Sequence, residues 1–303
     1  MEKEQKNKIF VYTGTGNSFA TAKILAKELD AQVIHITAEL VHEKTTFQCD
    51  ISAIVFPVYA YGLPKLVRRF IRSSRFEVGT MATIATVGST GGGALAEANR
   101  QLRKRGCRVQ YSRQIKSVEN FVHMFRLPKE DRIKTLIERQ SELTQHIAEQ
   151  IKQGSKRRIK MPFRPDSVIV RTVFMSVVGM FARRYKFLDT CNGCGVCYRV
   201  CPPNAVQMRA VEIVSCQTLM ECGPDDQAFP LQDEEIPSTT EQNFMPVLNP
   251  KKCDSCQACM QLCPMRAIKF GKITPESRRY IHPDVNLGEL FKRSTSTLRD
   301  ENR

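Results

Sequence analysis

The sequence contains no long apolar run, and that absence limits where the protein can act. Within the apolar stretch at 168–184, the longest run free of charged residues spans only 172–182, which is too short to cross a bilayer. No apolar export signal precedes the first strand-like segment, because residues 2–6 are charged or polar. Many thiols without an export signal predict a cytoplasmic protein of a reducing, anaerobic cell.

The sequence also lacks the signatures of nucleic-acid binding, although its charge would permit such binding. Lys and Arg number 46 against 31 Asp and Glu, which gives a formal net charge of +15. A surface this basic could bind nucleic acid, anionic lipid or an acidic protein. The sequence has no recognition helix, RNA-binding aromatic pattern or zinc finger. An acidic protein is therefore the expected partner, and a basic surface that binds nothing is the alternative.

What the sequence does contain is one cysteine pattern written twice. Eight of the 12 cysteines fall into two runs, each spaced C-x-x-C-x-x-C-x-x-x-C-P. The first run is Cys191, Cys194, Cys197 and Cys201, and the second is Cys253, Cys256, Cys259 and Cys263. Zinc ribbons and disulfides are the alternatives, but zinc sites use paired C-x-x-C units and would leave the C-P cysteines poorly used.

This double run resembles that of bacterial ferredoxins, which bind two 4Fe–4S clusters. In that family the fourth cysteine of each run ligates the other cluster. The ligand sets that the resemblance implies are Cys191, Cys194, Cys197 and Cys263 for one cluster, and Cys253, Cys256, Cys259 and Cys201 for the other. Cys216 and Cys222 lie between the runs and are expected to be ordinary loop thiols, with a redox role as the alternative.

A glycine- and hydroxyl-rich turn follows the first predicted strand. Residues 8–12 are apolar enough for a buried strand, and 19–29 predict a helix. Such a turn at a helix N-terminus is typical of phosphate binding. No Lys supports a Walker A loop, and Phe19 stands where a dinucleotide fingerprint needs Gly. The pattern favours a terminal monophosphate, with a plain turn as the alternative. The residues that would hold it are Thr13, Gly14, Thr15, Gly16, Asn17 and Ser18.

The turn resembles a flavodoxin phosphate loop, and the cofactor that this resemblance implies is FMN. Two later loops match flavin-contacting segments of that family, after strands predicted at 51–56 and 81–87. A further segment follows a strand that begins at 108–111 and contains Asn120; His123, just after it, could border the flavin. The flavin-contacting residues implied are Pro57, Val58, Tyr59, Tyr61, Gly62, Val87, Gly88, Ser89, Gly91, Gly92 and Asn120.

The predicted fold has two parts. Strands alternating with helices over 1–155 predict an α/β flavodoxin-like doubly wound parallel sheet. A linker and apolar helix at 156–186 lead to a small α+β two-cluster ferredoxin domain at 187–275, with an acidic insertion at 207–249. The apolar helix is expected to pack between the domains, with a membrane surface as the alternative. Residues 276–303 are predicted to be a polar tail.

Together these features predict an electron-transfer iron–sulfur flavoprotein. It would pass electrons between two 4Fe–4S clusters and FMN, and on to or from a redox protein such as an acidic electron carrier. The alternative is an FMN-dependent reductase that acts directly on a small substrate such as a quinone or nitro compound. The sequence shows no acid–base pair near the three loops and no nicotinamide fingerprint, so it favours transfer to another protein.

The doubled cysteine spacing predicts about eight irons and, with the flavodoxin-like loops, one FMN per chain. Iron, acid-labile sulfide and flavin measured on one anaerobically purified sample check this expectation. Stoichiometric zinc without acid-labile sulfide would contradict it.

Overall fold

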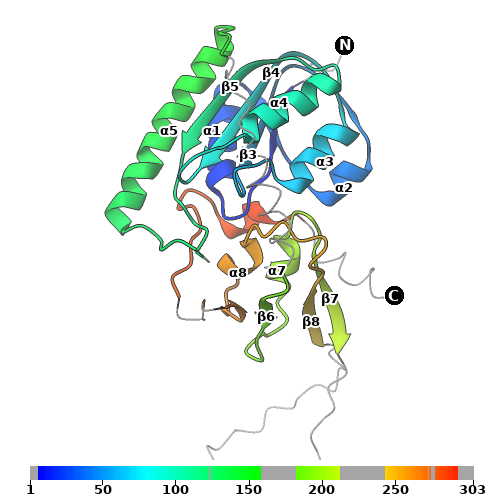
Figure 1. The fold of residues 1–303 in the computed structure, drawn as a ribbon, viewed down its shortest axis with the longest axis vertical. Helices are drawn as coiled ribbons and strands as arrows, with labels where there is room; N and C mark the ends of the chain where they lie inside the picture. Colours follow the sequence, from blue (N-terminus) through cyan, green and yellow to red (C-terminus); the bar gives the residue numbers. More distant parts are fainter. Residues whose placement is uncertain are drawn as a thin grey trace, which may run out of the picture.

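The computed structural model describes residues 6–122, 124–157, 182–211, 243–271, 273 and 277–292 (Figure 1). Several sequence predictions lie outside these residues. They concern His123, Cys216, Cys222, nearly all of the apolar helix at 168–184 and most of the acidic insertion. No helix within the described ranges is both long enough and apolar enough to cross a membrane.

The first domain is built on one parallel sheet of five strands. These are β1 (Asn7–Val11), β2 (Ala31–His35), β3 (Thr46–Pro57), β4 (Arg75–Val87) and β5 (Val109–Lys116), in the order β2-β1-β3-β4-β5. This is the flavodoxin-like order of doubly wound folds, so the predicted fold of this half is confirmed. Along β3, burial alternates at first and becomes continuous from Ser52 to Phe56, because there helices cover both faces.

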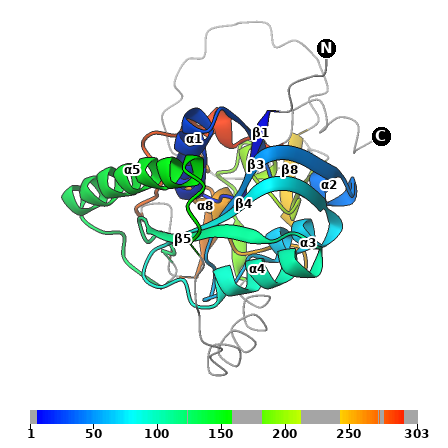
Figure 2. The same cartoon turned by 90° about the horizontal axis from the view of Figure 1, so that it is seen from above.

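Helices cover the two faces of the sheet in separate groups (Figure 2). On one face lie α1 (Asn17–Glu28) and α5 (Glu130–Lys152), and on the other lie α2 (Ala38–His42), α3 (Lys65–Ser73) and α4 (Ala94–Lys104). The α3 side encloses aromatic side chains around Phe10, whose ring centroid lies 4.6 Å from that of Phe47 and 5.0 Å from that of Phe70. The two cores fix the sheet, and with it the loops at its carboxyl edge.

The second domain repeats one short unit. Helix α7 (Val196–Arg199) follows the first two cysteines of the first run and contains the third, and α8 (Ala258–Gln261) takes the corresponding place in the second. Strand β6 (Tyr185–Phe187) pairs antiparallel with β9 (Ile268–Phe270), and β7 (Val206–Val211) pairs with β8 (Asn243–Leu248). The predicted small α+β domain is therefore present.

The two domains share one apolar core instead of being joined by a linker alone. Val196 and Val200 of the α7 unit, with Ala258 and Leu262 of the α8 unit, belong to the same buried cluster as Ile9. Polar contacts add to this packing, since Asp254 Oδ2 accepts a hydrogen bond from the Leu66 amide at 3.2 Å and from the Tyr12 hydroxyl at 3.1 Å. The cysteine runs are therefore held directly against the carboxyl edge of the sheet.

Residues 277–292, which the sequence analysis assigned to a polar tail, pack against the first domain. This segment includes a 3₁₀ helix, η1 (Leu287–Leu290), with a capping box formed by Asn286 and Glu289. Leu290 and Val285 lie in the same core cluster as α1. In Figures 1 and 2 the segment, drawn in red and orange, lies beside α1. Its few apolar side chains are too widely spaced among polar ones for sequence periodicity to reveal the packing.

Candidate functional site

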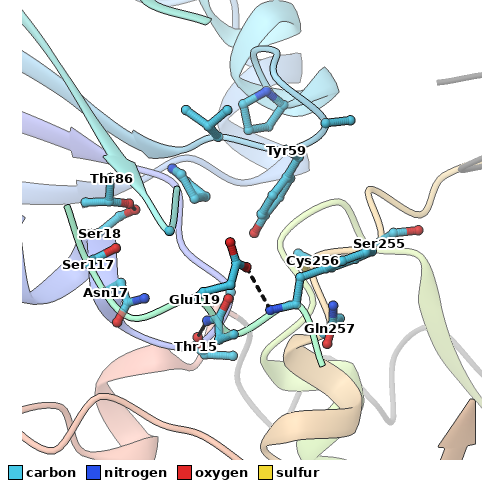
Figure 3. A pocket seen from close by; sticks show the side chains of 18 of the residues that line it. Thr15, Asn17, Ser18, Tyr59, Thr86, Ser117, Glu119, Ser255, Cys256 and Gln257 are labelled. Atoms are coloured by element: carbon cyan, nitrogen blue, oxygen red, sulfur yellow. Dashed lines mark hydrogen bonds between the residues drawn. The ribbon is translucent and has the colours of Figure 1, made fainter. Parts of the chain in front are cut away.

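A cavity of about 180 Å³ lies where the carboxyl ends of β1, β3, β4 and β5 meet the second cysteine run. Ligands of open α/β sheets bind in this crevice, where the strand order reverses. Figure 3 shows Thr15, Asn17, Ser18, Thr86 and Ser117 on one side of the cavity and Ser255, Cys256 and Gln257 on the other. The cavity is thus enclosed by both domains.

The loop at 13–18 forms the hydroxyl-rich end of the cavity. Gly16 has φ +105°, which an L side chain rarely adopts, and it turns the chain into α1. The Gly16 amide donates to Thr13 Oγ1 at 3.1 Å, Ser18 Oγ lies 2.7 Å from Thr86 Oγ1, and Asn120 Nδ2 donates to Thr15 Oγ1. These bonds hold hydroxyls and the N-terminus of α1 at one place, which suits an anion such as a phosphate.

The loop after β3 presents an aromatic side chain to the cavity in a strained turn. Ala60 and Tyr61 have φ of +50° and +60°, although neither is glycine. Tyr59 and Gly62 close the turn, since each amide donates to the other residue's carbonyl, at 3.2 and 2.9 Å. Left-handed non-glycine residues cost about 1–2 kcal/mol each and gather at functional sites. The turn places Tyr59 in the cavity wall and leaves Tyr61 46% exposed at its rim.

The loop after β4 supports that turn from behind. A Cβ placed on Gly92 would lie 2.6 Å from Tyr61 Cβ, and Gly92 itself has φ +47°. The neighbouring Gly93 amide donates to the Tyr61 carbonyl at 3.1 Å. Glycine is therefore required at residue 92 by the close approach of the second loop.

The cavity brings together most, but not all, of the predicted flavin-contacting residues. Those that line it are Thr13, Gly14, Thr15, Asn17, Ser18, Pro57, Val58, Tyr59, Tyr61, Gly88, Ser89 and Asn120. The structure does not place the others in the lining: Gly16, Gly62, Val87, Gly91 and Gly92. Gly16 instead faces His282 and Gly91 faces Gln114, so these glycines allow close packing behind the loops.

Sequence reasoning missed part of the cavity wall. Ser117 and Glu119 line it directly after β5, and their place at a strand end was a usable signal. The segment from Asp254 to Gln257 also lines it. No pattern in the sequence relates that segment to the sheet, because the contact depends on how the domains pack.

The eight run cysteines gather into two groups. Cys191, Cys194, Cys197 and Cys263 line one small apolar hollow together with Met265. Burial, and then the charges of Cys191, Cys263 and Cys194, raise the pKa of Cys197. In the other group, burial and the charge of Cys201 raise the pKa of Cys253 to about 12. Burial, and then the charges of Cys253, Cys256 and Cys201, raise the pKa of Cys259. Each group thus takes its fourth thiol from the opposite run.

Thiols crowded in this way need cations to become thiolates, because burial and mutual repulsion both disfavour the charge. Among the residues that the structure describes, no three Cys, His, Asp or Glu side chains form a group able to hold one metal ion. A multi-iron cluster differs, since each thiolate binds a different iron and the four thiols stay further apart. Each group supplies the four thiols that one 4Fe–4S cluster binds.

The backbone of the two cysteine runs repeats in detail. Gly193 and Gly195 have φ of +70° and +71°, and the matching Ser255 and Gln257 have +53° and +61°. After the fourth cysteine, Asn204 and Arg266 both have φ +50°. Residues other than glycine at such φ values indicate that the surrounding loop imposes the turn. The second run therefore follows the same path around its thiols without the glycines of the first.

The second cysteine run touches the phosphate-type loop through its backbone. A Cβ on Gly14 would lie 2.6 Å from the Cys256 carbonyl oxygen and 3.2 Å from the Tyr59 hydroxyl. Cys256 also lines the cavity. Burial, and then the charge of Cys256, raise the pKa of the Tyr59 hydroxyl well above its ordinary value. No larger residue than glycine fits at residue 14 without separating the two domains.

Comparison with known proteins identifies the second domain. Residues 190–267 match the family model described as "4Fe-4S dicluster domain". A polyferredoxin of Methanothermobacter marburgensis is 34% identical over 95 residues, which cover 28% of this chain and 22% of the polyferredoxin. The chain therefore spans about a fifth of that relative's length. These matches confirm the predicted ferredoxin character of the cysteine runs.

Solved structures similar to the first domain include flavodoxins. That of Megasphaera elsdenii is 13% identical, with 47% of this chain and 98% of the flavodoxin covered and a TM-score of 0.30. Flavodoxin 2 of Bacillus cereus is 17% identical, with 48% and 99% covered and a TM-score of 0.31. At such scores the strand order described above, and not these matches, establishes the flavodoxin-like fold.

The grouping of the thiols predicts how single cysteine variants will behave. Cys201→Ala should damage the cluster of the second run, and its spectrum should resemble that of Cys253→Ala. Cys263→Ala should instead resemble Cys191→Ala, because each fourth cysteine belongs to the opposite group. Electron paramagnetic resonance of the four reduced variants, with iron content, checks this. If Cys201→Ala resembles Cys191→Ala, each run binds its own cluster and the cross-run assignment fails.

Proposed function

We propose that this chain, a flavodoxin-like domain fused to a 4Fe–4S dicluster domain, transfers electrons between two 4Fe–4S clusters and FMN. One observation carries the proposal. The segment from Asp254 to Gln257 forms part of the cavity wall, so one group of cluster thiols lies beside the proposed flavin site. When bound, the clusters would supply single electrons and the flavin a centre able to accept one or two.

The clusters would be held by the two groups of thiols. Cys191, Cys194, Cys197 and Cys263 would hold the first cluster, and Cys253, Cys256, Cys259 and Cys201 the second. The donor set supports this assignment, since eight thiols lie in two groups beside turns whose amides surround them. The Ser255 amide, for example, donates to Cys253 Sγ at 3.3 Å, and the Ala205 amide donates to Cys201 Sγ at 3.2 Å. Amide donors stabilise negative charge on cluster sulfur and raise the reduction potential.

FMN would occupy the cavity with its phosphate at the loop of residues 13–18. Thr13, Thr15 and Ser18 line the cavity and are almost fully buried, and their hydroxyls are oriented by the Gly16 amide, the Asn120 side chain and the Thr86 hydroxyl. Tyr59 would lie against the ring system, and Gly88 and Ser89 would leave its edge uncovered. Glu119, also in the cavity wall, would place a carboxylate near the bound cofactor. A carboxylate beside a flavin disfavours added negative charge and lowers its reduction potential.

The position of the two thiol groups supports an order of the centres along the path. Cys256 lines the cavity, so the second group is the one beside the flavin site. In the first group Cys194 is exposed, and Met265, which lines the same hollow, is 45% exposed. A redox protein would therefore bind beside the first group of thiols. The second group would then carry electrons between the first group and the cavity.

The partner expected at the first group is an acidic electron carrier. Lys186 and Arg266 are exposed and adjoin Phe187 and Met265, which line the hollow of the first group. Positive charge around an exposed apolar contact attracts an acidic partner and speeds its association. The formal charge of +15 over the whole chain acts in the same sense.

Direct reduction of a small substrate is the second candidate function, and one observation favours it. Tyr61, Met124 and Phe125 all line the cavity and are 46%, 59% and 50% exposed. An apolar rim beside a flavin could receive a planar acceptor such as a quinone or nitro compound. Turnover of menadione that stays unchanged when Cys194 is replaced by Ala would favour this function over transfer between proteins.

Loss of two hydroxyls should weaken FMN binding and spare the clusters. The double variant Thr15→Val with Ser18→Ala removes two donors from the phosphate end, each worth about 1.5–3 kcal/mol toward a charged group. Ser112→Ala is the matched control, because that buried hydroxyl bonds Thr83 and Asn99 away from the cavity. Flavin fluorescence titration and iron content check the prediction. Unchanged FMN affinity in the double variant would remove the flavin from this loop.

Electron exchange between clusters and flavin should occur within one chain. After partial reduction by a limiting low-potential donor, the redistribution rate should be independent of protein concentration over a tenfold range. The rate should also be insensitive to salt, because the two domains are already in contact at Cys256 and Gly14. Stopped-flow absorbance, with flavin and cluster bands followed separately, provides the measurement. A rate that rises in proportion to protein concentration would show exchange between molecules and refute the in-chain path.

A further inference from the structure

The segment that follows the ferredoxin domain reaches back to the phosphate-type loop. We call residues 277–292 the C-terminal strap. Its Tyr280 and His282 are 5% and 1% exposed. The Tyr280 hydroxyl donates to Asn17 Oδ1 at 2.7 Å, and the His282 amide donates to the Thr15 carbonyl at 2.9 Å. Two residues of the loop are thus held by a segment more than 250 positions away in the sequence.

The strap fixes the shape of this loop as well as its place. A Cβ on Gly16 would lie 2.9 Å from His282 Cβ, so His282 packs directly on the left-handed turn that opens α1. Burial lowers the pKa of His282, which keeps its ring neutral at physiological pH. The Asn17 side chain is also bonded at its other end, because its Nδ2 donates to the Val118 carbonyl at 2.9 Å. With both ends of that amide bonded, Asn17 cannot turn away from the first turn of α1.

The same strap is bonded to both cysteine runs. The Tyr280 amide donates to Gln261 Oε1 at 2.9 Å, and Gln261 lies on α8 between Cys259 and Cys263. At the other end the Lys292 amide donates to the Arg199 carbonyl at 2.7 Å, and the Arg199 guanidinium lies 3.6 Å from the Phe291 ring centroid. Arg199 lies on α7, between Cys197 and Cys201.

A second branch of the network returns to the cavity. Gln261 Nε2 donates to the Asn120 carbonyl at 3.0 Å, and Asn120 Nδ2 donates to Thr15 Oγ1. Gln261 therefore connects the strap, the helix between two cluster cysteines and a cavity residue. Gln261 itself is only 4% exposed, so these bonds are shielded from water.

We infer that the C-terminal strap is part of the flavin phosphate site and that Tyr280 is its positioning residue. Tyr280 does not line the cavity; it holds Asn17 so that the amides and hydroxyls of residues 13–18 are already arranged for a phosphate. Through Gln261 the same residue ties that arrangement to the cluster domain. Binding at either site then favours binding at the other, since both stabilise one arrangement of the strap. The inference rests on the proposed FMN site.

The test uses the full chain and two ligands, FMN and riboflavin, which differ only in the phosphate. Tyr280→Phe removes the hydroxyl and keeps the ring. It should weaken FMN binding roughly threefold to tenfold, the effect of one lost hydrogen bond, and leave riboflavin binding unchanged. Tyr111→Phe is the matched control, because its hydroxyl bonds Gln150 on α5, away from the cavity. Flavin fluorescence titration gives both affinities, and thermal unfolding reports any general loss of stability.

Hydrogen exchange of the wild-type chain provides a measurement that needs no variant. FMN should slow exchange of the His282 amide, and riboflavin should not, because only the phosphate tightens the loop whose carbonyl this amide bonds. Three results would overturn this inference alone. They are equal FMN affinity of wild type and Tyr280→Phe, equal weakening of FMN and riboflavin binding in the variant, and FMN-independent exchange at the His282 amide. A wild-type chain that binds riboflavin and FMN equally, or neither, would overturn the proposed FMN site as well.

Discussion

The contact between the Cys256 carbonyl and Gly14 is the constraint on which the rest of the site depends. At this point the second cysteine run and the phosphate-type loop meet backbone to backbone, and a single added Cβ would lie 2.6 Å from the carbonyl oxygen. The shared apolar core around Val200 and Leu262 keeps the domains at this separation. A cavity enclosed by both domains follows from it, and so does the short path proposed between thiols and flavin.

Buried polar groups hold this interface in one arrangement. Asp254 accepts hydrogen bonds from Leu66 and Tyr12, and burial raises the pKa of its carboxyl. An unpaired carboxylate there would be costly, so sliding of the domains by even one residue is disfavoured. Gln261 and Tyr280 act in the same way at the other side of the cavity. The interface is therefore defined by specific partners as well as by apolar area.

Much of the fold and part of the site could be predicted from local signals. The strands of the sheet and most helices of the first domain follow from apolar segments alternating with helical ones, although β3 and β4 begin earlier than predicted and α2 was missed. Helix α2 is only five residues long, too short for a periodic pattern. The loop near Thr15 was found because glycine and hydroxyl residues follow a strand and precede a helix there, and the loop near Tyr59 was found through its resemblance to a flavodoxin segment. Gly16 and Gly92, which were assigned to the flavin, are not among the residues that line the cavity, and each lies close to a neighbouring segment, Gly16 to His282 and Gly92 to Tyr61.

The sequence by itself determined the chemistry of the cysteine runs, because eight thiols at a doubled spacing restrict the possible metal centres to very few. It also determined the sheet, because local periodicity dictates which segments become strands. Only the tertiary structure decided which thiol group lies beside the cavity, and that residues 277–292 return to Asn17 and Thr15. Those contacts join residues far apart in the chain, either through one hydrogen bond or through a backbone contact too close to admit a Cβ. Such contacts arise from packing geometry, which leaves no periodic trace in the residues that make them.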